Sequence, residues 1–117
     1  MSDLKILHNP RCSKSRQTLQ LLHEKGFTPQ VIEYLKTPVS ADELELIVSQ
    51  LGFSSARQLM RKGEVAYKEQ NLSDPILTEK TLISAMLETP KLIERPIVIF
   101  NGKAAIGRPP ESVLDIL

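Results

Sequence analysis

The strand-forming stretches of this sequence stand near its two ends, and helical patterns fill the region between them. Residues 4–8 form the first strand pattern, which the Asn9-Pro10 turn signal follows at once. A helical segment then runs from Ser13 to about Lys25, and a second strand pattern covers 30–35. Two strands separated by one helix predict a βαβ unit, whose strands are parallel.

The second group of strands lies near the C-terminus. Pro96 to Phe100 is a β-branched run, and the Asn101-Gly102 pair after it is the strongest two-residue hairpin signal. Residues 103–106 can return beside this run, and a final helix is expected from Glu111 to Ile116. Both ends together predict an α/β fold with a mixed four-stranded sheet flanked by helices. This layout (βαβ, helical insert, ββα) resembles the thioredoxin fold.

Helical signals dominate the region between the two groups of strands. Ser40-Ala41-Asp42-Glu43 is a capping box, and apolar residues then recur at helical spacing until Gly52. Another helix is expected from near Thr78 to Pro90, with shorter helical pieces at about 54–61 and 64–70. Repeats, low-complexity tracts and linkers are missing, so 1–117 is predicted to be a single domain with a helical insert at about 40–90.

Composition narrows the classes of protein to which the chain can belong. Its 117 residues are 41% hydrophobic, and 15 Lys and Arg against 14 Asp and Glu give a net charge of +1. Neither a basic field for nucleic acid nor an apolar run of roughly 20 residues for a membrane is present, and no metal site is expected. One cysteine and the lack of a signal-peptide pattern favour the cytoplasm. Without heptads or an apolar stripe, we expect a monomer.

Cys12 lies between the first strand and the first helix, where backbone N–H groups and the helix dipole stabilise negative charge. Between Leu4 and His23 there is no acidic residue, although the stretch contains four Lys or Arg residues. Because Lys14 and Arg16 oppose the dipole in the first turn, we expect a negative group to occupy the site. The same arrangement lowers the pKa of a thiol and predicts a nucleophilic thiolate.

The residues around this cysteine have both structural and functional interpretations. Ser13 is expected to be the N-cap of the helix, while Ser15 either fills a polar position in the first turn or donates its hydroxyl to the sulfur. His8 either orients the loop and adjusts the thiol pKa or makes a structural hydrogen bond. We assign Arg16 to an anion site and regard Arg11 and Lys14 as solvated surface charges.

Cys12-Ser13-Lys14-Ser15 has the C-x-x-C spacing with serine in place of the second cysteine. Since an internal disulfide cannot form, an oxidised or covalently modified Cys12 must be resolved by an external thiol. The cysteine count therefore predicts a partner such as glutathione, acting as a co-substrate, or glutaredoxin. We expect no bound cofactor.

Three motifs stand out along the chain: HNPRCSKSR at 8–16, ERPIV at 94–98 and GRP at 107–109. In this order and spacing they are similar to the glutaredoxin-coupled arsenate reductase family, and the similarity spans essentially the whole chain. The resemblance implies that Cys12 attacks arsenate and that three arginines hold the oxyanion, namely Arg61, Arg95 and Arg108. Arg57 and Lys62 stand close to Arg61 and are alternatives to it.

The resemblance also implies a backbone feature and a reaction sequence. In thioredoxin-like proteins a cis proline places backbone beside the active sulfur, so we expect a cis bond before Pro96. Cys12 attacks arsenate, glutathione displaces oxygen, and glutaredoxin removes the glutathione as arsenite leaves. Because phosphate has nearly the shape and charge of arsenate, we expect phosphate or sulfate to bind as mimics.

Two other functions are consistent with the same fold. A glutathione-dependent thiol oxidoreductase with another substrate would share the site. A redox regulator that binds RNA polymerase also resembles these reductases over most of their length, but its switch typically uses a C-x-x-C pair. This chain has C-x-x-S, and its three arginines suit an anion site that a regulator does not need.

Overall fold

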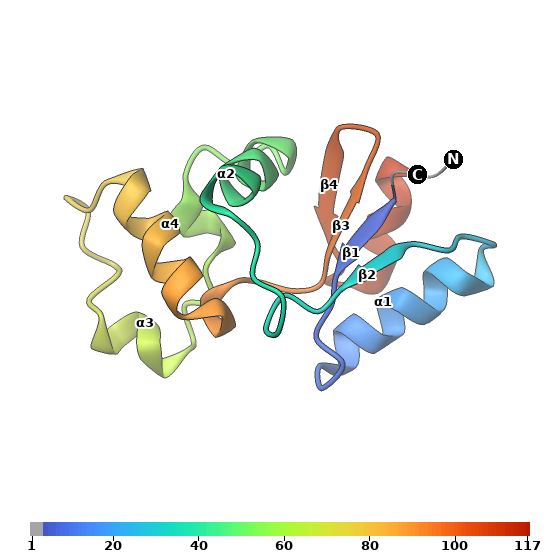
Figure 1. The fold of residues 1–117 in the computed structure, drawn as a ribbon, viewed down its shortest axis with the longest axis horizontal. Helices are drawn as coiled ribbons and strands as arrows, with labels where there is room; N and C mark the ends of the chain where they lie inside the picture. The colour runs from blue at the N-terminus through green and yellow to red at the C-terminus, as the bar shows by residue number, and fades with distance from the viewer. Residues whose placement is uncertain (1–3) are drawn as a thin grey trace. The chain divides into compact units, whose positions relative to one another are not determined.

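Four strands from the two ends of the chain form one mixed sheet in the computed structural model, which describes residues 4–117 (Figure 1). They are β1 (Lys5–Leu7), β2 (Gln30–Ile32), β3 (Ile97–Phe100) and β4 (Lys103–Ile106), in the order β2-β1-β3-β4. β1 is parallel to β2 and antiparallel to β3, which is antiparallel to β4. The predicted mixed four-stranded sheet is confirmed.

One face of this sheet packs against α1 (Ser13–Glu24) and the 3₁₀ helix η3 (Pro110–Ile116) (Figure 1). Ile6 of β1 pairs with Val98 of β3, and both side chains are buried with Leu22 of α1 and Val113 of η3. The final helix expected from Glu111 to Ile116 is present as the 3₁₀ helix η3.

β2 is shorter than its sequence pattern predicts, because the strand ends at Ile32 and not at Leu35. Its only neighbour, β1, ends at Leu7, and the His8 N–H donates the last bond across the pair to the Ile32 carbonyl at 2.8 Å. Beyond this point the chain turns, with two backbone N–H groups donating to the carbonyl of Glu33.

The Asn101-Gly102 hairpin between β3 and β4 is confirmed. Asn101 has φ of 53° and Gly102 has φ of 79°. A two-residue loop with positive φ at both positions matches the right-handed twist of the flanking strands, and glycine adopts such values without a steric penalty.

The middle of the chain forms a helical unit of its own, Pro38–Glu94, while the sheet unit consists of Arg95–Leu117 and the described residues up to Thr37. The elements of the helical unit are α2 (Ala41–Gln50), η1 (Ala56–Leu59), α3 (Val65–Glu69), α4 (Glu79–Glu88) and η2 (Pro90–Leu92). The insert expected at about 40–90 coincides with this unit. Residues 1–3 lie outside the described residues, and the single-domain organisation stays a prediction.

Local signals start the two longer helices of this unit. The Ser40 hydroxyl accepts from the Glu43 N–H at 3.1 Å and the Glu43 carboxylate accepts from the Ser40 N–H, which confirms the capping box. Thr78 caps α4 by accepting from the Thr81 N–H. Within residues 4–117, none of the helices has the length and apolar character needed to cross a membrane.

Candidate active site

Strand register brings the three sequence motifs to one edge of the sheet. Leu7 of β1 pairs with Ile97 of β3, which pairs in turn with Ile106 of β4. The residues directly after β1, before β3 and after β4 therefore lie side by side. The Gly107 N–H donates to the Pro96 carbonyl at 2.9 Å, which joins the second motif to the third.

Cys12 is the N-cap of α1, with φ of −93° and ψ of 123°. Its own N–H donates to the Asn9 carbonyl at 3.0 Å, and its carbonyl accepts the first helical bond, from the Arg16 N–H, at 3.0 Å. The expectation that Ser13 is the N-cap is therefore wrong, because Ser13 is already the first helical residue. After the turn at Asn9 the helix begins at Ser13, one residue earlier than expected from a cap at Ser13.

The Cys12 sulfur lies among donors and positive charges. The residue is 9% exposed, and Nη2 of Arg108 is 3.5 Å from Sγ. Burial raises the pKa of the thiol, but the Ser15 N–H, the Arg95 charge, the Lys14 N–H and the Arg108 charge together outweigh it. The pKa of Cys12 is therefore below the ordinary value for a thiol, and the thiolate form is favoured.

The Ser15 hydroxyl makes hydrogen bonds within the loop, and the Ser15 backbone N–H donates to the Cys12 sulfur. Its Oγ accepts from the Asn9 N–H at 3.0 Å and shares a 2.7 Å hydrogen bond with Nδ1 of His8. The side chain is fully buried, so these bonds are well shielded from water. The Ser15 hydroxyl thus fixes the path of the chain between β1 and Cys12, while its N–H stabilises the thiolate.

His8 directly follows β1 and is buried. Burial lowers the pKa of the ring, Glu33 partly offsets this by raising it, and Arg16 lowers it further. The neutral ring is therefore favoured at neutral pH. The structural hydrogen bond considered for His8 is present in its contact with Ser15.

Arg16 and Arg108 both have carbonyl partners near the site. Nη1 of Arg16 donates to the Pro10 carbonyl at 2.8 Å, and Nε of Arg108 donates to the Arg95 carbonyl at 2.8 Å. The bond of Arg108 links the second motif to the third and orients its guanidinium, whose Nη2 reaches the sulfur. The assignment of Arg16 to an anion site stays a prediction.

The peptide bond between Arg95 and Pro96 is cis, as expected. The bond between Arg108 and Pro109 is also cis, which the sequence did not lead us to expect. About 5–6% of X-Pro bonds in folded proteins are cis, so the residues alone do not reveal such a bond.

The helical unit contains the remaining arginine candidates. Arg57 donates from Nε to the Leu72 carbonyl at 3.1 Å and from Nη2 to the Asp74 carbonyl at 2.7 Å. Its charge also contributes to lowering the pKa of Glu79, after the hydrogen bonds that this carboxylate accepts from Ala56 and Ser55. The Arg57 guanidinium is thus engaged in holding the loop after α3.

Arg61 also makes its contacts within the helical unit. Its Nη1 lies 3.3 Å from Oε2 of Glu64 and donates to the Lys91 carbonyl at 3.2 Å. The neighbouring Lys62 is exposed. Arg61 lies in a different unit from Cys12, and its role at the oxyanion stays a prediction.

Comparison with known proteins identifies the family. The family model described as ArsC family matches residues 7–116. The chain belongs to the ArsC family. An arsenate reductase of Neisseria meningitidis serogroup A is 49% identical to this ArsC-family protein over 117 residues, which are 100% of both chains. Escherichia coli (strain K12) has a relative named "Uncharacterized protein YfgD", 59% identical over 97% of this chain and 96% of the relative.

A solved structure confirms the fold of this ArsC-family protein. The arsenate reductase from Vibrio cholerae has 55% sequence identity and a TM-score of 0.95, and the match covers 97% of each chain. The predicted thioredoxin-like fold is confirmed.

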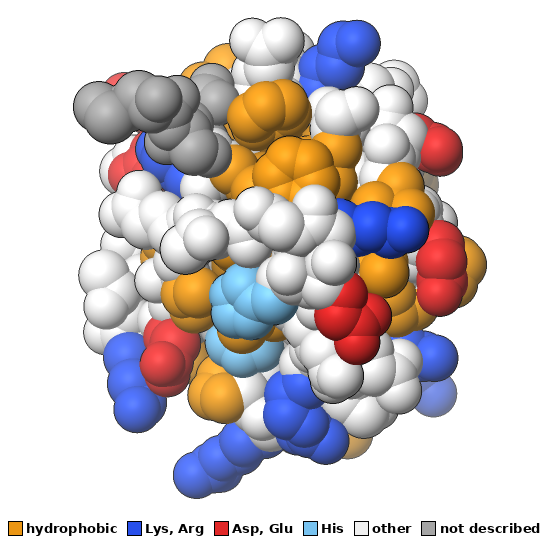
Figure 2. Space-filling view, turned by 90° about the vertical axis from the view of Figure 1, so that its right-hand side faces the viewer, with side chains coloured by type: hydrophobic (Ala, Val, Ile, Leu, Met, Phe, Trp, Pro, Cys, Tyr) orange, Lys and Arg blue, Asp and Glu red, His pale blue; other side chains and the backbone are white. Residues whose placement is uncertain are grey.

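Charged side chains of both signs lie on the face of this ArsC-family protein that Figure 2 shows. Figure 2 shows one face of the sheet unit, where Lys and Arg side chains and Asp and Glu side chains occur at several separate places. Over the described range 4–117, no group of three or more His, Cys, Asp or Glu side chains is placed to hold a metal ion.

The sequence interpretation missed the part that Asn9 takes in building the site. Its Oδ1 accepts from the Arg11 N–H at 3.0 Å, and its carbonyl accepts from the Cys12 N–H. Asparagine often bonds the backbone two residues ahead, so the signal was available in the Asn9-Pro10 turn. The sequence gives no signal for the backbone N–H groups of Lys14 and Ser15 that donate to the sulfur, because every non-proline residue has a backbone N–H.

Proposed function

We propose that this protein reduces arsenate to arsenite through the thiolate of Cys12, with glutathione and glutaredoxin supplying the electrons. The observation that carries the proposal is a thiol of lowered pKa with an arginine Nη2 atom 3.5 Å from its sulfur. A nucleophile and a guanidinium at this separation suit attack on an oxyanion. Relatives named arsenate reductase, 49% and 55% identical to this chain, support the choice of arsenate.

In the first step the thiolate attacks arsenic, an S–As bond forms and one arsenate oxygen leaves as water after protonation. The thiol of glutathione then replaces a second oxygen, which also leaves as water. A glutaredoxin thiolate attacks the glutathione sulfur and breaks its bond to arsenic, so the electron pair stays on arsenic and reduces As(V) to As(III). Hydrolysis of the remaining S–As bond releases arsenite and restores Cys12.

The arginines stabilise the charge of the oxyanion and of these adducts. Arsenate carries one to two negative charges near neutral pH, and guanidinium groups offer it planar, bidentate hydrogen bonds. We assign this role to Arg95 and Arg108, whose charges both lower the pKa of Cys12, and to Arg61 as the third member. His8, Ser15, Arg16 and Pro96 shape the loop that presents the sulfur.

Selectivity for arsenate arises in the chemical step. Phosphate has nearly the same shape and charge, so oxyanion binding discriminates poorly between the two. Phosphate and sulfate therefore occupy the site as non-reacting mimics. Because the chain has one cysteine, the reaction needs an external thiol. We place the protein in the reducing cytoplasm, which supplies such a thiol. In this proposal it acts as a monomer and binds neither nucleic acid nor a membrane.

The test is arsenate reduction by purified protein with glutathione, glutaredoxin and a recycling system. We expect arsenite formation that needs both glutaredoxin and Cys12, and we expect Cys12→Ser to abolish turnover while it retains oxyanion binding. Near-normal reduction by Cys12→Ser eliminates the covalent role. Failure of the well-folded native chain to form arsenite overturns the choice of arsenate and favours another thiol-linked substrate.

A further inference from the structure

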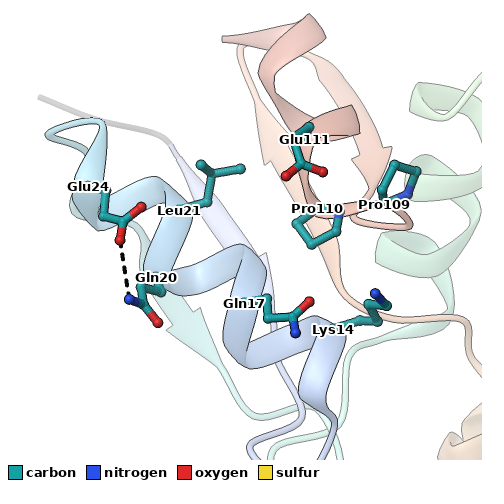
Figure 3. A pocket seen from close by; sticks show the side chains of 8 residues that line it. All are labelled: Lys14, Gln17, Gln20, Leu21, Glu24, Pro109, Pro110 and Glu111. Carbon is teal, nitrogen blue, oxygen red and sulfur yellow. Dashed lines mark hydrogen bonds between the residues drawn. The ribbon is translucent and has the colours of Figure 1, made fainter.

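A polar groove runs along α1 in the sheet unit. One wall consists of α1 residues including Lys14 and Gln17, and the other consists of Pro109–Glu111 (Figure 3). The groove encloses about 410 Å³, which lies within the roughly 300–1,000 Å³ of small-molecule sites. Leu21 and Pro110 give it an apolar floor between the polar groups.

One end of the groove lies at the start of α1, two residues after Cys12. Lys14, at one end of the groove, also directs its backbone N–H to the Cys12 thiol. Pro109, on the opposite wall, directly follows Arg108, whose Nη2 lies 3.5 Å from Sγ. A molecule lying in the groove is therefore flanked by the two segments that hold the sulfur.

Charges of both signs line the groove at different places. Lys14 supplies a cation at the end near the sulfur, and Glu111 supplies a carboxylate from the facing wall (Figure 3). Gln17 lies next to Lys14 on α1, and the carboxylate of Glu24, a second anion of the lining, accepts from Nε2 of Gln20 at 3.2 Å. Such a lining suits a peptide with a carboxylate at one end and an ammonium at the other, because Lys14 pairs with the carboxylate and Glu111 pairs with the ammonium.

We propose that this groove binds the glutathione co-substrate, with one peptide carboxylate at Lys14 and the γ-glutamyl ammonium at Glu111. Glutathione carries two carboxylates and one ammonium, and its thiol stands between the two ends. Placing the glycine carboxylate at Lys14 keeps the thiol toward the end of the groove near the Cys12 loop, and the γ-glutamyl arm extends along α1 past Gln17. The inference rests on the proposed function, because it assigns the site of that reaction's thiol.

A smaller cavity of about 210 Å³ lies beside the loop that precedes Cys12. It is lined by residues that include His8, Arg11, Glu33 and Lys36. No residue adjacent to Arg108 lines it, so a thiol there is not flanked by the guanidinium that approaches the sulfur. This cavity supplies the matched control, because Lys36 is an exposed cation that lies 3.5 Å from the carboxylate of Glu33 and lines no part of the groove.

The experiment measures binding without arsenate, using S-methylglutathione, whose blocked thiol cannot react. Titration of the full ¹⁵N-labelled chain, followed by amide chemical shifts, gives the Kd for wild type, Lys14→Gln, Glu111→Gln and Lys36→Gln. We expect the first two substitutions to raise the Kd about two- to fivefold each, as for partly exposed ion pairs. Lys36→Gln should keep the wild-type Kd.

A second ligand identifies which group Glu111 recognises. The deamino analogue of S-methylglutathione lacks the γ-glutamyl ammonium, so it should bind wild type more weakly, and Glu111→Gln should not weaken its binding further. Equal sensitivity of both ligands to Glu111→Gln overturns the assigned orientation. Wild-type Kd values in both groove variants, or no binding at millimolar ligand, overturn the site whatever the arsenate assay gives.

The groove can also be tested against docking of a protein partner. In the coupled assay, the proposal predicts a higher KM for glutathione in Lys14→Gln and Glu111→Gln with the KM for glutaredoxin unchanged. The opposite pattern assigns the groove to glutaredoxin and overturns the proposal. Because S-methylglutathione binding does not depend on arsenate, failure of the reductase function and failure of the groove assignment give different results.

Discussion

At the scale of single residues, the state of the Cys12 thiol is decided by opposing effects. Burial raises its pKa, but backbone donors and the charges of Arg95 and Arg108 together lower it by a larger amount. Since alkylation needs the thiolate, iodoacetamide should modify this single cysteine with a rate midpoint below about pH 8.5, the value for an ordinary thiol. Arg108→Gln removes one cation, so the midpoint should rise and the rate at about pH 7 should fall roughly two- to tenfold.

The comparison needs a variant that loses a positive charge elsewhere. Lys36→Gln does so at an exposed position near the end of β2, and it should keep the wild-type alkylation profile. Rates measured from about pH 5 to about pH 10 give each midpoint. An Arg108→Gln profile identical to wild type shows that the guanidinium at 3.5 Å does not stabilise the thiolate.

Much of this site can be predicted from residue types alone. The single cysteine, the basic flanks and the missing acidic residues are enough to indicate a stabilised thiolate. The partners of Ser15 cannot be read in the same way. Its hydroxyl bonds His8 seven residues earlier, and only the turn between β1 and α1 determines that these two side chains meet.

At the scale of secondary-structure elements, the end of β4 depends on close packing against α1 and β3. Gly107 is buried, and an added Cβ would lie 2.8 Å from Cγ of Pro96 and would also overlap Oγ1 of Thr18. Gly107→Ala must therefore displace an element that holds the site. We expect a loss of roughly 1–3 kcal/mol in the free energy of unfolding, measured by urea denaturation.

The chain offers a glycine control for this substitution. A Cβ on Gly63 meets no atom within 4 Å, and Gly63 has no positive φ. Gly63→Ala should be neutral or gain up to about 1 kcal/mol through the unfolded state. Equal effects of the two substitutions would mean that the β4 end can relax around an extra methyl group.

The start of α2 is a second place where one element depends on one side chain. Ser40→Ala removes the acceptor of the Glu43 N–H, so it should lower the free energy of unfolding by about 0.5–2 kcal/mol. Ser49→Ala changes the same residue type at an exposed position inside α2 and should be neutral or slightly stabilising, because alanine favours the helix. Urea denaturation of both variants measures the difference, and a Ser40→Ala loss no larger than that of Ser49→Ala contradicts the capping role.

These elements show where prediction from sequence succeeds and where it stops. The capping box at Ser40 and the hairpin at Asn101-Gly102 are local patterns, and both are confirmed. The early end of β2 depends on its neighbour β1 ending at Leu7, which no pattern within residues 30–35 reveals. The strand order β2-β1-β3-β4 was not predicted, since hairpin and helix signals alone leave open how the two ends of the chain pair.

At the scale of the whole molecule, a net charge of +1 provides no general attraction for anions. Any affinity for phosphate must therefore come from local groups, and we assign it to the arginines near Cys12. A ligand that binds only the folded state stabilises it by RT ln(1 + [L]/Kd), which is about 1.4 kcal/mol at ten times the Kd. For a domain of this size, such a gain raises the Tm by several degrees.

Phosphate should therefore raise the Tm above its value in chloride of equal ionic strength, and Arg95→Gln should reduce this increment. Phosphate also stabilises proteins in general by exclusion from their surface, but that effect is shared by both variants, so the difference between their increments reports the site. Cys12→Ser keeps the arginines and should retain most of the wild-type increment. If Arg95→Gln shows the full increment, then phosphate acts only as a general stabiliser and Arg95 does not bind the oxyanion.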